Sequence, residues 1–162
     1  MTKYRWGNFD KERVFVNKSY QPSIQTTQFV TLRTATDMIR KGDKGRAIQL
    51  LDKNFAAFPN FNFPYNSSTM YYLDAYMQAG AYDKAKPHIK ILADNLLANL
   101  KFYNSLSAED KAGSFQNDFM QDLQTKEQLL KLVETSGDKA YKDELDKMFV
   151  AYKIENMLPQ QR

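Results

Sequence analysis

Apolar residues recur along this chain at intervals of three and four, which places them on one face of a helix. The first such stripe consists of Phe29, Leu32, Ala35 and Ile39. Pro22 and Ser23 would begin this helix, with the serine as its N-cap, and Gly42 would end it. The pattern therefore predicts a first amphipathic helix that buries this stripe.

A second apolar stripe follows the glycine and predicts a second helix, from Asp43 to Pro59. Its buried face would consist of Ala47, Leu50, Leu51, Phe55 and Phe58. Because only two or three residues join the two helices, we expect them to lie antiparallel. The prolines and asparagines of residues 59–65 predict a loop after the second helix.

Two more helices are predicted between this loop and residue 103. Asn66 or Ser67 would cap the third helix, and Gly80 would end it. Its apolar positions are Met70, Leu73, Tyr76 and Met77. The fourth helix would run from about Tyr82 to Tyr103, with Pro87 in the first two turns, where a missing N–H costs least. Its stripe consists of Ala85, Ile89, Leu92, Leu96 and Leu100.

The remaining segments would cover the ends of these four helices. Two further stripes predict capping helices at about 107–136 and 138–156, the first with Ser107 as its N-cap. Residues 1–21 lack helical periodicity, so we expect an extended arm whose aromatic side chains cover apolar surface. Residues 157–162 would be a frayed tail. The pattern predicts an all-α fold with one domain, residues 22–156.

The turn at Gly42 recurs at Gly80, 38 residues later, and each glycine is followed after five residues by an alanine, Ala47 or Ala85. This interval is close to the 34-residue period of tetratricopeptide repeats, whose helix pairs stack to share a core. The sequence resembles that superfamily in two units, about 24–59 and 66–103. The resemblance implies two antiparallel helix pairs, flanked by the arm and by the two capping helices.

Several motifs carry a second resemblance. They are Tyr4-Arg5-Trp6-Gly7-Asn8, Leu32-Arg33, Gly42 through Asp52, Pro59, Pro64-Tyr65, Tyr76, Ala79-Gly80 and Tyr103-Asn104-Ser105-Leu106. They are similar to the soluble C-terminal part of a family of bacterial multi-pass membrane proteins of unknown function, related to membrane glycosyltransferases that use lipid-linked sugars. The segment Val14-Phe15-Val16-Asn17-Lys18 departs from the family's pattern.

The second resemblance has consequences for location and chemistry. It implies that a missing upstream segment tethers this domain to a membrane and that the domain faces the periplasm, with the cytoplasm as the alternative. It also implies that any chemistry belongs to the membrane portion of the parent protein. The partner of the domain would then be another protein or that membrane portion.

Composition and charge narrow the function classes. Hydrophobic residues make up 43% of the chain, and 6 glycines and 5 prolines suit long helices joined by short turns. The absence of cysteine excludes a disulfide framework and a thiolate zinc site. The net charge of +4 is a modest surplus of 23 basic over 19 acidic residues, so we expect no nucleic-acid partner. No apolar run is long enough to span a membrane.

Three groups of polar residues could carry chemistry, and each has a simpler structural interpretation. A single histidine, His88, supports neither a metal cluster nor a catalytic triad. Asp118 and Asp122 share a helical face, but without a third ligand they indicate a charged surface. The basic residues Lys84, Lys86, His88 and Lys90 alternate and so diverge around a helix. We expect no catalytic residue, cofactor or metal in this domain.

The resemblance to tetratricopeptide stacks places a concave wall on the first helix of each unit. Leu32 and Thr36 stand where superfamily members that bind a terminal carboxylate have lysines and asparagines, which argues against such a clamp. The wall would accept an amphipathic partner helix, or the C-terminal helices of this chain would fill it. The candidate binding residues are Arg33, Arg40, Tyr65, Met70, Asp74 and Met77.

The sequence therefore leads to two functional hypotheses. The first is a non-enzymatic protein-interaction or assembly domain, the C-terminal soluble module of a membrane protein. The alternative is an accessory, glycan-contacting domain of a glycosyltransferase-like enzyme, in which the rings of Trp6, Tyr65, Tyr71 and Tyr72 would stack on an acceptor sugar. Exposure or burial of these aromatic residues distinguishes the two.

Overall fold

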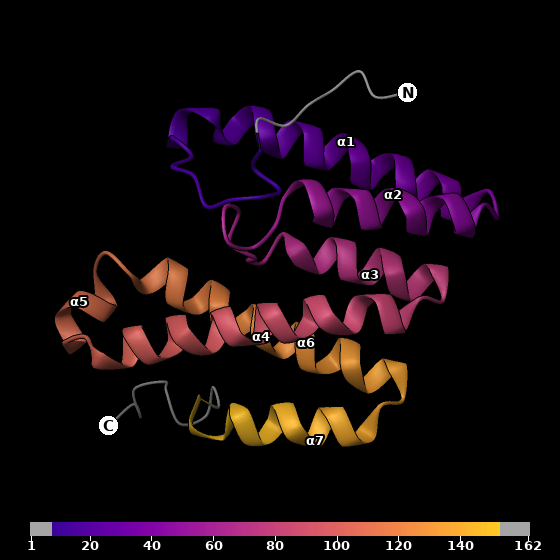
Figure 1. The fold of residues 1–162 in the computed structure, drawn as a ribbon. Helices are drawn as coiled ribbons and strands as arrows, with labels where there is room; N and C mark the ends of the chain where they lie inside the picture. Colours follow the sequence, from indigo (N-terminus) through magenta and orange to yellow (C-terminus); the bar gives the residue numbers. More distant parts are fainter. Residues whose placement is uncertain (1–7, 153–162) are drawn as a thin grey trace. The chain divides into compact units, whose positions relative to one another are not determined.

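The structure, a computed structural model, describes residues 8–152 and confirms the all-α fold, with no strand among those residues. Its α-helices, labelled in Figure 1, are α1 (Gln21–Arg40), α2 (Lys44–Ala57), α3 (Thr69–Ala79), α4 (Tyr82–Ser105), α5 (Ala108–Ala112), α6 (Gln116–Ser136) and α7 (Lys139–Met148). Short 3₁₀ turns lie at Lys18–Tyr20 and Val150–Tyr152. The predicted frayed tail and the end of the last predicted helix lie outside the described residues.

The chain divides into two compact units, which we describe separately. Unit 1 contains residues 1–65 and 71–85, and therefore α1, α2 and most of α3. Unit 2 contains residues 66–70 and 86–162, and therefore most of α4 together with α5, α6 and α7. One boundary between the units falls inside α3, after residue 70, and another falls inside α4, after residue 85.

In unit 1, α1 and α2 pack along each other as the short connection requires. Asp43, the residue at which the second helix was predicted to begin, caps α2 by accepting a hydrogen bond from the Arg46 N–H. Ala35 of α1 and Ala47 of α2 are both completely buried, and residues this small allow packed helices to approach closely. Leu51 continues the buried stripe of α2, whereas Leu50 is only half-buried.

The buried stripe predicted for α1 is confirmed only in part, since Leu32 and Ile39 are half-buried beside Ala35 but Phe29 is not buried. Phe29 is 62% exposed, and Ala35 is the one fully buried residue of the helix. On the other side of Ala35, the half-buried residues are Gln28, Thr31 and Met38. The side of α1 that faces α2 is therefore centred on Ala35. Helix α1 also begins at Gln21 without a side-chain cap, and not at Ser23. A helix rich in threonine offers no strongly apolar stripe to fix its orientation from sequence.

An aromatic cluster forms the other half of the core of unit 1. The ring of Phe55 on α2 contacts those of Tyr65, Tyr72 and Tyr76, with centroids 5.4, 5.9 and 5.9 Å away. The Tyr76 hydroxyl donates a 2.8 Å hydrogen bond to Asp52, whose other oxygen lies 3.1 Å from Lys84 Nζ. Burial and this carboxylate raise the pKa of Tyr76 well above its usual range. The network joins α3 and the start of α4 to α2.

Unit 2 is built around α6, which buries Phe119, Leu123, Leu129 and Val133. Residues 107–136 were predicted as one helix, but the chain bends at residues 113–115 and forms α5 and α6 instead. The predicted cap is present, since the Ser107 hydroxyl accepts a 3.1 Å hydrogen bond from Asp110 N–H. Helix α7 packs on α6 through Tyr141 and Leu145, and Phe149, which is 2% exposed, completes this core.

Three turns between helices use the same backbone conformation. Gly42, Gly80 and Gly137 have φ angles of 85°, 76° and 81°, which glycine adopts without a steric penalty. In the first two turns, the residue after the glycine donates its N–H to the carbonyl of the residue four positions before the glycine. These bonds run from Asp43 to Met38 and from Ala81 to Tyr76, each 2.9 Å long.

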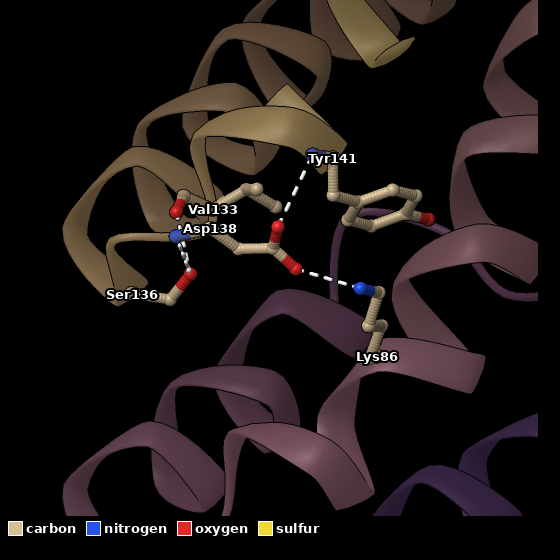
Figure 2. Close-up of polar contacts among 5 residues, drawn as sticks. All are labelled: Lys86, Val133, Ser136, Asp138 and Tyr141. Atoms are coloured by element: carbon tan, nitrogen blue, oxygen red, sulfur yellow. Dashed lines mark hydrogen bonds and ion pairs between the residues drawn. The ribbon is translucent and has the colours of Figure 1, made fainter. Parts of the chain in front are cut away.

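The third turn inserts a side chain into this pattern. The Ser136 hydroxyl donates to the Val133 carbonyl at 2.6 Å and accepts from the Asp138 N–H at 3.3 Å (Figure 2). It thus bridges the two groups that bond directly in the other turns. The first buried residue after Gly137 is Tyr141, four positions on, whereas Ala47 and Ala85 lie five positions after their glycines. The sequence predicts a helix break at Gly137, but this shift keeps the third turn out of the glycine-to-alanine spacing of the first two.

The arm is less extended than predicted. Residues 8–12 form a turn in which Lys11 and Glu12 both donate to the Asn8 carbonyl, and only residues 13–17 are without regular structure. The arm then passes into the 3₁₀ turn and α1 (Figure 1). The expectation that its aromatic residues cover apolar surface holds for Phe9, whose ring contacts Phe63 at 5.7 Å, but not for Phe15, which is 89% exposed.

Candidate functional surface

The outward side of α1 brings together two of the predicted binding residues. Arg33 and Arg40 lie seven residues apart, about two helical turns or roughly 10 Å along the axis, on one face. Both are exposed. Arg40 is paired with Asp37, which also binds Lys41, whereas Arg33 forms no hydrogen bond or ion pair with any described residue. Arg33 is therefore a cation available to a partner.

This face, which we call the outer face of α1, has an apolar centre. It consists of the exposed residues Thr26, Phe29, Val30, Arg33, Thr36 and Arg40. Phe29 and Val30 are 62% and 56% exposed, so two large apolar side chains lie in solvent one turn before Arg33. The stripe predicted to be buried includes Phe29, and the sequence analysis does not identify Val30 as a surface residue. The alternation of Thr26, Phe29, Arg33, Thr36 and Arg40 at steps of three and four was the available signal.

The other predicted binding residues do not join this face. Tyr65 is 9% exposed and packs on Phe55, and burial raises its pKa to about 12. Met70 is buried as well and belongs to unit 2. Asp74 and Met77 both lie on α3, where Asp74 is exposed and accepts a 2.6 Å hydrogen bond from Gln78, and Met77 is half-buried.

The aromatic residues proposed to bind a glycan differ in exposure. Tyr71 is 68% exposed, whereas Tyr65 and Tyr72 are 9% and 7% exposed and belong to the core of unit 1. Trp6 lies outside the described residues. Among the three tyrosines, only Tyr71 presents its ring to a ligand, and one exposed ring does not make a stacking platform.

The lysines at the start of α4 are paired with different carboxylates. Lys84 Nζ lies 3.1 Å from Asp52, Lys86 Nζ 2.6 Å from Asp138, and Lys90 Nζ 2.9 Å from Asp94. Figure 2 shows Lys86 reaching the Asp138 carboxylate, which also caps α7 by accepting from Tyr141 N–H. The Lys86 ammonium also lies 4.8 Å from the centre of the Tyr141 ring. Lys84 and Lys86 thus join α4 to other parts of the chain, Lys90 pairs within α4, and the three lysines do not form a shared anion site.

Asp122 is the most unusual carboxylate of unit 2. It lies on α6 at 8% exposure and accepts a 2.8 Å hydrogen bond from Asn99 of α4. Burial raises the pKa of Asp122, Asp118 adds to this effect, and hydrogen bonds from Asn99 and Tyr103 oppose it. Since Asn99 and Tyr103 already engage this carboxyl, its geometry is that of a structural contact between α4 and α6.

No group of three or more His, Asp or Glu side chains within residues 8–152 is arranged to bind a metal ion. His88 is half-buried on α4. None of the helices that the structure describes is long and apolar enough to cross a membrane.

Comparison of this chain with protein-family models, curated proteins and solved structures found no match. The geometry of the chain's own residues therefore carries the functional argument.

Proposed function

We propose that this chain is a non-enzymatic protein-interaction or assembly domain whose outer face of α1 binds an acidic amphipathic helix. The observation that carries the proposal is the exposure of Phe29 and Val30 beside an unpaired arginine, Arg33. Exposed apolar residues flanked by charge are typical of binding surfaces. The stripe from Thr26 to Arg40 is about 21 Å long, which matches a partner helix of four turns.

The chemistry of the partner follows from the charges on this face. An arginine presents a planar set of donors that suits a carboxylate, so an acidic residue on the partner would pair with Arg33. Basic residues outnumber acidic residues in unit 1 as a whole, which favours approach of an acidic segment. The apolar side of the partner helix would cover Phe29 and Val30.

The proposal includes a place in a larger protein. On the strength of the motif resemblance, we propose that the domain is a C-terminal, tetratricopeptide-like module of a bacterial membrane protein and that it faces the periplasm. The three glycine turns support a repeated helix-pair architecture. Immunoblotting of fractionated cells tests the tether: a membrane-bound chain longer than 162 residues is expected, and a 162-residue chain in the soluble fraction would contradict it.

Binding at the outer face of α1 can be tested with a designed peptide. The probe is a 20-residue amphipathic helix with one leucine face bordered by glutamates, titrated into the full chain. We expect Phe29→Ser and Arg33→Glu each to weaken binding at least about tenfold. Lys53→Glu is the matched control, because it makes the same charge change at an exposed position of α2. Equal weakening by Lys53→Glu would show that net charge alone attracts the peptide.

A further inference from the structure

The arm is held by one asparagine of the loop between α2 and α3. Asn62 Oδ1 accepts a 2.9 Å hydrogen bond from Val14 N–H. Its Nδ2 group donates to the carbonyl oxygens of Phe9 and Glu12 at 2.7 and 2.8 Å. One carboxamide thus binds three main-chain groups of a segment that is about 50 residues away in sequence. Figure 1 shows this segment beside the loop.

The loop holds this geometry through bonds of its own. Asn62 N–H and Phe63 N–H both donate to the Pro59 carbonyl, at 3.1 and 2.9 Å. The Asn60 side chain accepts from Tyr65 N–H at 2.8 Å, which closes the loop at its other end. The Phe63 ring rests on Phe58, which is 4% exposed, with centroids 5.2 Å apart. Asn62 and Phe63 are therefore positioned by the loop and not by the arm.

The arm contributes little that would fix it permanently in this place. Beyond the contacts to Asn62 and the edge-on contact of Phe9 with Phe63, its side chains are largely exposed, including Lys11, Arg13 and Phe15. Asn17 caps the 3₁₀ turn that precedes α1, so the connection from Val14 consists of Phe15 and Val16. A short connection between a docked segment and a helix favours exchange of that segment between copies.

We propose that Asn62 and Phe63 form a peptide-binding clamp and that its partner in trans is the arm, residues 9–14, of a second copy of this chain. The second copy offers the same main-chain groups and the same phenylalanine, so the clamp binds it with the same contacts. Within one chain, the arm competes at a local concentration of order millimolar, which keeps the clamp closed in dilute solution. This proposal does not depend on the outer face of α1.

A pair of complementary full-length variants tests the exchange. The clamp variant, Asn62→Leu, cannot bind an arm but keeps its own arm available. The arm variant, Phe9→Ala with Val14→Pro, keeps the clamp but lacks both the ring and the N–H that the clamp binds. Because the chain has no cysteine, Lys131→Cys at an exposed position of α6 allows one dye to be attached to the clamp variant.

Fluorescence anisotropy of the labelled clamp variant measures binding to the arm variant. We expect saturable binding at least tenfold tighter than binding to the unmodified chain, whose clamp is filled by its own arm. Adding Asn62→Leu to the arm variant should abolish binding. Equal binding to the arm variant and the unmodified chain, no binding at all, or binding that survives the added Asn62→Leu would each overturn the proposal. Thermal unfolding verifies that every variant is folded.

Discussion

Helix α1 of unit 1 and helix α6 of unit 2 differ in the side chains that they bury. In unit 1, α1 buries only Ala35 fully, and Phe29 and Val30 lie in solvent. In unit 2, α6 buries seven residues, which include the charged Asp122 and Lys126 as well as Thr125. Helix α6 thus buries three polar side chains, whereas α1 exposes two large apolar ones.

The buried lysine of α6, Lys126, has partners for its charge within unit 2. Lys126 is 1% exposed, and its ammonium donates a 2.7 Å hydrogen bond to the Tyr152 carbonyl and lies 2.8 Å from Glu127. A buried ammonium persists only where such partners are present. This difference supports our proposal that the binding surface lies on α1 in unit 1.

The largest expected effect contrasts one core residue with one surface residue. Leu123→Ala removes a completely buried side chain of α6 and should lower the free energy of unfolding by about 2–5 kcal/mol. Phe29→Ala on α1 should change it by less than about 0.5 kcal/mol, because the ring is mostly in solvent. Urea unfolding measures both. A large loss from Phe29→Ala would mean that the outer face of α1 is part of the core.

A smaller loss is expected from the polar contact within unit 1. Tyr76→Phe removes the hydroxyl that binds Asp52 and should cost about 1–3 kcal/mol, since the acceptor is charged. Lys84 remains beside Asp52, so the carboxylate keeps one partner. Thermal unfolding of Tyr76→Phe gives the value. A loss below about 0.3 kcal/mol would contradict this prediction, because it would show that water replaces the hydroxyl.

Replacing either of two glycines, three residues apart, by alanine should change the stability of the chain, with opposite signs. Gly42 has a φ of 85°, so Gly42→Ala should destabilise the chain by about 1–2 kcal/mol. Gly45 lies within α2, and a methyl group there would meet open space, so Gly45→Ala should stabilise it by up to about 1 kcal/mol. Calorimetry on the pair measures both signs. If both changes destabilised the chain, the assignment of the turn to Gly42 alone would be wrong.

The smallest effect concerns the pH dependence of unit 2. Burial raises the pKa of Asp122 above the unfolded value of 3.8, so the folded state holds this proton more tightly than the unfolded state. Stability from Asp122 is therefore greatest at low pH and declines as pH rises through its folded pKa. Relative to Asp122→Asn, the unmodified chain should become less stable as the pH rises above 3.8. An opposite slope in urea unfolding would contradict the direction of the shift.

The sequence predicted the features that depend on local chemistry. The glycine turns, the Asp43 and Ser107 caps and the limits of α2 follow from residues that act within one helical turn. The orientation of α1 is less predictable, because half-buried residues flank Ala35 on both sides of the helix, and this leaves Phe29 exposed. Nothing near Asn62 in sequence signals its bonds to the arm, because those partners are about 50 residues away.

For the candidate surface, the resemblance to tetratricopeptide stacks pointed to the first helix and so to Arg33 and Arg40, and both are exposed. It also named Tyr65 and Met70, which the structure places in the core. Apolar residues of a loop and of a first helical turn carry no local signal of exposure, and their burial depends on tertiary contacts such as that of Tyr65 with Phe55.

Site-specific photocrosslinking, in cells that produce the protein, tests most directly whether the outer face of α1 is a binding surface. A photoreactive phenylalanine analogue replaces Phe29 on α1 or, as the control, Phe102 on α4, which is 48% exposed in unit 2. We expect position 29 to give one discrete crosslinked partner, attached through an acidic amphipathic helix, and position 102 to give none. The same products at both positions, or none at position 29, would contradict the assignment of the binding surface to the outer face of α1.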